Sequence, residues 1–109
     1  MPTQADWSRF LDALRLAVLG RDRIGAVETQ LFNQLFRRHL SEGWDKVYEY
    51  EGIDAWIDYG RVDLKKGPHK LVFTWDNWSE GEISGTAAVV QGIARRHGLT
   101  CVRGGRLTP

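Results

Sequence analysis

Apolar positions in the first part of the chain recur every three or four residues, which is typical of one buried face of an α-helix. A polar turn at residues 20–23 separates two such stripes. With so short a connection, the pattern predicts an N-terminal hairpin of two antiparallel helices, the second ending near Leu40. The first stripe comprises Trp7, Phe10, Leu11, Leu14, Ala17 and Val18, and the second comprises Ile24, Val27, Leu31, Phe32, Leu35 and Phe36.

From Trp44 onward the apolar positions alternate with polar ones, as in strands that bury one face. The alternating runs cover residues 44–51, 54–59 and 71–76. Gly52 separates the first two, and the turn sequence at residues 65–68 precedes the third. The pattern therefore predicts an antiparallel meander of three strands.

A third helical stripe follows, with Ser84 as its expected N-cap and Gly98 at its expected C-terminal end. Residues 99–103 are expected to add a fourth strand, and residues 104–109 to form a frayed tail. The apolar positions of this helix are Val89, Val90, Ile93 and Ala94.

The expected element order is ααβββαβ in a single domain over residues 1–109. Helices grouped before strands favour the α+β class, with the helices on one face of a mainly antiparallel sheet of three or four strands. The other sheet face would carry Trp56 between Asp54 and Asp58.

The segment 75–82 holds two of the five tryptophans and three carboxylates. Trp75 is expected to point inward at the end of a strand, and Asp76 and Asn77 to form a turn. Trp78 would then lie on the surface. Aromatic side chains beside acids are typical of interface hot spots, so the candidate binding residues are Trp56, Trp78, Asp76, Glu80 and Glu82.

Charge is distributed unevenly along the chain. Residues 1–42 sum to +1, residues 43–83 to −4 and residues 84–109 to +4. The basic block is too small for a nucleic-acid footprint, and no aromatic residue after Trp78 is available to stack on bases. We therefore expect no nucleic-acid partner.

No complete catalytic or metal-binding motif is present. His39, His69 and His97 are isolated, and Cys101 is the only thiol, so neither a metal site nor a cofactor is expected. Two facing carboxylates could act as acid and base in a hydrolase, whereas a solvated outer sheet face explains the same acids. Residues 84–86 could bind an anion at a helix N-terminus or simply cap the helix.

The N-terminal apolar residues are interleaved with charged ones, unlike a signal peptide, and no apolar run is long enough to span a bilayer. A single cysteine fits a reducing compartment. The chain is therefore expected to be cytoplasmic, without a membrane partner.

Two functions remain open from the sequence. The first is a non-enzymatic protein-binding module of adaptor, inhibitor or chaperone type. Its aromatic and acidic sheet face would bind another protein or a second copy, for instance in a homodimer. The second is a small enzyme or ligand-binding domain with a pocket between the 75–82 loop and the sheet. An enclosed pocket holding two carboxylates or a histidine would favour the enzyme, and a flat aromatic patch the binding module.

Overall fold

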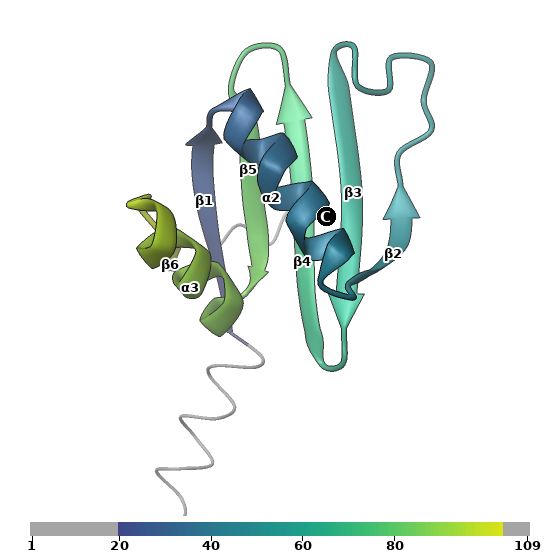
Figure 1. Ribbon diagram of the computed structural model, residues 1–109. Coiled ribbons are helices and arrows are strands. Elements are labelled where there is room, and N and C mark those ends of the chain that lie inside the picture. Colours follow the sequence, from purple (N-terminus) through teal and green to yellow (C-terminus); the bar gives the residue numbers. More distant parts are fainter. Residues whose placement is uncertain (1–19, 104–109) are drawn as a thin grey trace, which may run out of the picture.

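The computed structural model describes residues 20–103, which form an antiparallel sheet with two helices packed on one face (Figure 1). The strand order is β2-β3-β4-β5-β1-β6. This arrangement belongs to the α+β class. The elements in chain order are β1 (Arg21–Val27), α2 (Thr29–Ser41), β2 (Asp45–Glu49), β3 (Tyr59–Lys66), β4 (His69–Asp76), β5 (Glu80–Thr86), α3 (Ala87–His97) and β6 (Val102–Arg103).

The predicted N-terminal helical hairpin is wrong. Its first helix lies outside the described residues, and the start of its second helix is strand β1, which pairs with β5 and β6. The register of β1 shifts between Ile24 and Val27, and Ala26 has a φ of 52°. This bulge turns both apolar residues toward the core although they are three positions apart. A strand with a bulge can thus imitate helical spacing.

The predicted meander of three strands is also wrong in its details. Residues 56–58 form a turn instead of a strand, Ala55 makes only an isolated bridge to Tyr59, and β3 begins at Tyr59. Ser84 does not cap a helix but lies within β5, which inserts between β4 and β1. The helix α3 begins at Ala87 and ends at Gly98, whose φ of 63° is the left-handed conformation expected there. The fourth predicted strand is reduced to the two residues of β6.

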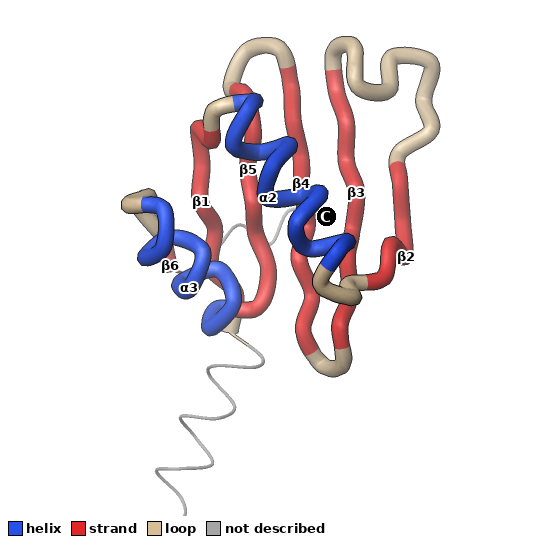
Figure 2. The backbone as a smooth tube through the Cα atoms, viewed as in Figure 1, coloured by secondary structure: helices blue, strands red, loops and turns tan. Residues whose placement is uncertain are grey.

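The core lies between the sheet and the helices (Figure 2). Phe73 on β4 is fully buried and makes edge-to-face contacts with Phe32 and Phe36 of α2, at centroid distances of 5.5 and 5.6 Å. A Cβ at Gly81 would overlap the Phe32 ring, so this glycine allows α2 to pack closely over β5. The other large, fully buried side chains are Ile24, Val27, Val62, Leu64, Leu71, Ile83 and Val90.

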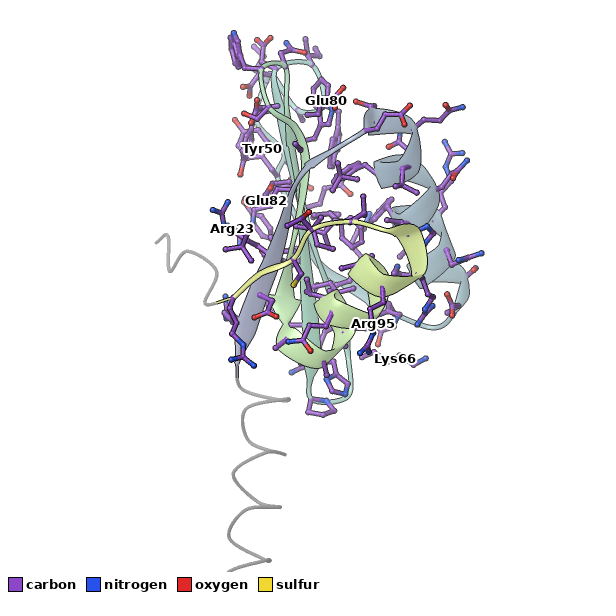
Figure 3. All side chains as sticks on the ribbon, turned by 90° about the vertical axis from the view of Figure 1, so that its left-hand side faces the viewer. Arg23, Tyr50, Lys66, Glu80, Glu82 and Arg95 are labelled. Atoms are coloured by element: carbon purple, nitrogen blue, oxygen red, sulfur yellow. The ribbon has the colours of Figure 1, made fainter. Side chains whose placement is uncertain are left out.

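The opposite face of the sheet carries no helix. Figure 3 shows the sheet nearly edge-on, with the helices on the right and Arg23, Tyr50 and Glu82 on the left. Arg23 Nη1 donates a hydrogen bond of 2.9 Å to Glu82 Oε1 across β1 and β5. On β3, Arg61 lies over the Tyr48 ring and also pairs with Asp63. This open face is therefore covered largely by polar side chains that pair with one another.

Candidate functional site

Two loops meet at the upper end of the sheet in Figure 2, one joining β2 to β3 and the other joining β4 to β5. Two hydrogen bonds tie them together. The Asn77 backbone N–H donates to the Asp58 carbonyl (3.2 Å), and Asn77 Nδ2 donates to Asp58 Oδ1 (2.7 Å). The loops therefore form one continuous surface.

The β2–β3 loop is also held by bonds of its own. The N–H of Ala55 donates to the Gly52 carbonyl and that of Ile57 to the Asp54 carbonyl, each at 2.9 Å. The Tyr50 hydroxyl donates to Asp54 Oδ1 at 2.6 Å, and this bond raises the pKa of the tyrosine. A loop with this many internal bonds is pre-organised, so a partner that binds it has less chain entropy to remove.

Trp56 adopts a φ of 61°, which is unusual for a bulky residue. Its N–H donates to the Tyr59 carbonyl (2.7 Å), and its ring packs against Phe32 at a centroid distance of 6.3 Å. A Cβ at Gly60 would overlap the indole, so the glycine leaves space for it. The strained backbone conformation thus keeps Trp56 packed against the domain along one side and 40% exposed.

The β4–β5 turn confirms the predicted orientations of Trp75 and Trp78. Trp75 packs against the core and donates its indole N–H to Thr29 Oγ1 at 3.0 Å. Asp76 Oδ1 accepts the N–H groups of Trp78 (2.8 Å) and Ser79 (2.6 Å), and these bonds lower the pKa of the Asp76 carboxyl. The turn therefore holds Trp78 outside the fold.

Four large apolar side chains on these loops are exposed, and we call them the apolar tip. The exposed fractions are 102% for Ile53, 84% for Trp78, 65% for Ile57 and 40% for Trp56. The segments 50–58 and 76–80 carry five carboxylates and no lysine or arginine. The apolar tip therefore lies on loops that combine exposed apolar side chains with net negative charge.

Four of the five predicted binding residues lie on these loops, namely Trp56, Asp76, Trp78 and Glu80. Glu82 does not, because it lies on the open sheet face in its ion pair with Arg23. The expected aromatic and acidic surface is thus at the end of the sheet and not on its face. Ile57 of the apolar tip was missed because residues 54–59 were predicted as a strand, and Ile53, which lies between two predicted strands, was given no role.

A small cavity of about 200 Å³ lies next to Trp75. It is close to the predicted pocket between the 75–82 loop and the sheet, which a small enzyme or ligand-binding domain would need. Its lining residues are Thr29, Phe32, Asn33, Trp56 and Trp75. None of these side chains can transfer a proton near neutral pH, and the volume is below the 300 Å³ or so of most ligand pockets. The cavity therefore does not favour an enzyme.

Comparisons with protein-family models, with curated proteins and with solved structures found no match to this chain. Within residues 20–103, no helix is both long and apolar enough to cross a membrane. In the same part of the chain, no three His, Cys, Asp or Glu side chains are grouped so that they could hold a metal ion. Among the described residues, the apolar tip is therefore the feature that indicates a function.

Proposed function

We propose that the protein is a non-enzymatic protein-binding module and that the apolar tip is its binding surface. The observation that carries this proposal is the exposure of four large apolar side chains on loops held by hydrogen bonds. Exposed apolar groups on a rigid framework are typical of interaction sites, and tryptophan is the residue most enriched in interface hot spots.

The composition of the tip also indicates the chemistry of the partner. Burying an isoleucine side chain contributes about 1.5–3 kcal/mol, so a partner that covers Ile53, Ile57 and Trp78 gains substantial hydrophobic free energy. The carboxylates on the same loops favour a partner whose surface combines apolar and basic side chains. We infer a folded protein or peptide with such a surface.

Affinity capture with two matched variants tests the proposal. The tip variant carries Ile53→Ser, Ile57→Ser and Trp78→Ala, and the control carries Val47→Ser, which removes an exposed apolar side chain from β2. A protein captured by the wild type and the control, but not by the tip variant, is then purified and titrated. We expect its affinity for the tip variant to be at least about tenfold weaker than for the control.

The circular dichroism spectra of the three proteins show whether each is folded. A partner that binds the tip variant and the control equally well would contradict the proposal. So would the absence of any captured protein that distinguishes them.

A further inference from the structure

A second feature of the molecule is a groove of about 490 Å³ in the helical layer. The half-buried Leu31 and the almost fully buried Leu35 of α2 line it on the apolar side, and Arg37 and Arg38 add two exposed positive charges. His97, at the end of α3, also lines it. We call this feature the helix groove.

The helices around the groove are strongly basic. Together, α2 and α3 contain four arginines and two histidines, with no aspartate or glutamate. Glu28 and Glu42 only flank the two ends of α2. Figure 3 shows Arg95 and Lys66 on the same side of the sheet as the helices. The helix groove therefore combines apolar and basic lining residues, which is the chemistry inferred above for a partner of the apolar tip.

We propose that the apolar tip of one copy binds the helix groove of a second copy. This inference rests on the proposed function, since it names a partner for the same tip. Trp78, at 84% exposure, is the side chain best placed to enter a groove, and the acidic residues beside it would face Arg37 and Arg38. Opposite charge and shared apolar character favour the same contact.

The two surfaces differ, so a single contact between them, without a reciprocal one, joins copies head to tail. A dimer formed in this way still has one free tip and one free groove, which allows further copies to add unless a ring closes. A symmetric dimer would behave differently, because its single interface uses the same surface on both copies. This difference provides a sharp test.

The test uses the full chain and two defective variants. One is the tip variant described above, and the other is a groove variant with Arg37→Glu and Arg38→Glu. A control with Arg21→Glu and Lys65→Glu also reverses two exposed positive charges, but outside the helix groove. Sedimentation velocity over a wide concentration range measures the size of each protein alone and in mixtures.

We expect the wild type and the control to associate beyond a dimer as concentration rises, and each defective variant to remain a monomer. An equimolar mixture of the two defective variants should form a dimer and nothing larger, because one intact tip and one intact groove remain. The proposal is overturned if the wild type stays monomeric, if either variant associates like the wild type, or if the mixture stays monomeric. A monomeric wild type combined with selective capture of a different protein by the tip would remove only this inference and leave the proposed function standing.

Discussion

At the scale of single residues, Trp75 and Trp78 show how three positions can separate a core residue from a surface residue. Alternation along β4 turns Trp75 toward the helices, together with Leu71 and Phe73. The turn that follows ends this alternation. The carboxylate of Asp76 accepts the N–H groups of the turn, so Trp78 is left in solvent.

We therefore expect opposite effects from two alanine substitutions. Trp75→Ala removes a partly buried indole and its bond to Thr29, and should cost toward the lower end of about 3–5 kcal/mol. Trp78→Ala should change the free energy of unfolding by less than about 1 kcal/mol. Urea denaturation measures both, and a Trp78→Ala variant as unstable as Trp75→Ala would contradict the assignment.

The reactivity of the Cys101 thiol also depends on its surroundings. Burial raises the pKa of its thiol to about 11, and its hydrogen bond to Asp22, with an Sγ–Oδ2 distance of 3.3 Å, acts in the same direction. The thiol stays protonated near neutral pH, and a protonated thiol is a poor nucleophile. Because the residue is only partly buried, its low reactivity is expected from the raised pKa and not from complete exclusion of solvent.

The pH dependence of thiol labelling checks this pKa. In the native protein, the labelling rate should rise with a midpoint near pH 11, whereas the unfolded chain should approach the ordinary value of 9.0. At pH values below about 9, the thiol of the native protein should therefore react more slowly than the thiol of the unfolded chain. Equal rates for native and unfolded protein near pH 8 would contradict the raised pKa.

At the scale of elements, α2 stabilises the fold through one face. Phe32 and Leu35 are almost fully buried, and the Nδ1–H of His39 donates a hydrogen bond of 2.7 Å to the Leu35 carbonyl. The helix has no side-chain cap at its N-terminus. Its stability therefore depends mainly on packing against the sheet.

Leu35→Ala should accordingly lower the free energy of unfolding by about 2–5 kcal/mol, since it leaves a cavity in a well-packed core. Leu40→Ala, at an exposed position of the same helix, is the matched control and should cost less than about 1 kcal/mol. Thermal or urea unfolding measures both. If Leu35→Ala lowers the free energy of unfolding by less than about 1 kcal/mol, α2 does not contribute to the core as described. Leu14, in the first helix of the predicted hairpin, lies outside the described residues.

At the scale of the whole molecule, charge is separated between two surfaces. Five carboxylates and no basic residue lie on the loops of the apolar tip, and the four arginines of α2 and α3 lie on the helical layer. On the open sheet face, Arg23 pairs with Glu82 and Arg61 with Asp63. Positive and negative charges are thus paired on one surface and left separate on the other two.

Self-association driven partly by this separation should weaken with salt. Exposed charges are screened over about 10 Å at 0.1 M ionic strength and over about 3 Å at 1 M. We expect the mean size measured by sedimentation to fall as sodium chloride is raised, while the circular dichroism spectrum stays unchanged. If salt leaves the association unchanged or strengthens it, the contact is hydrophobic and has no net electrostatic contribution.

The sequence by itself determined features that depend on neighbouring residues. The turn before β4, the left-handed residue Gly98 after α3 and the outward position of Trp78 all follow from local spacing and turn chemistry. These patterns act over a few residues, so they can be recognised without knowledge of the tertiary contacts.

Only the tertiary structure decided the strand order and the place of the binding surface. Strand β1 forms because Arg21 and its neighbours pair with Thr86 and the rest of β5, which lie far along the chain. Because of its bulge, the apolar residues of β1 have the spacing expected of a helix. The loop around Ile53 and Ile57 is likewise shaped by bonds to the β4–β5 turn. Strand pairing and loop docking join distant residues, and hydrophobic periodicity carries no information about which segments will meet.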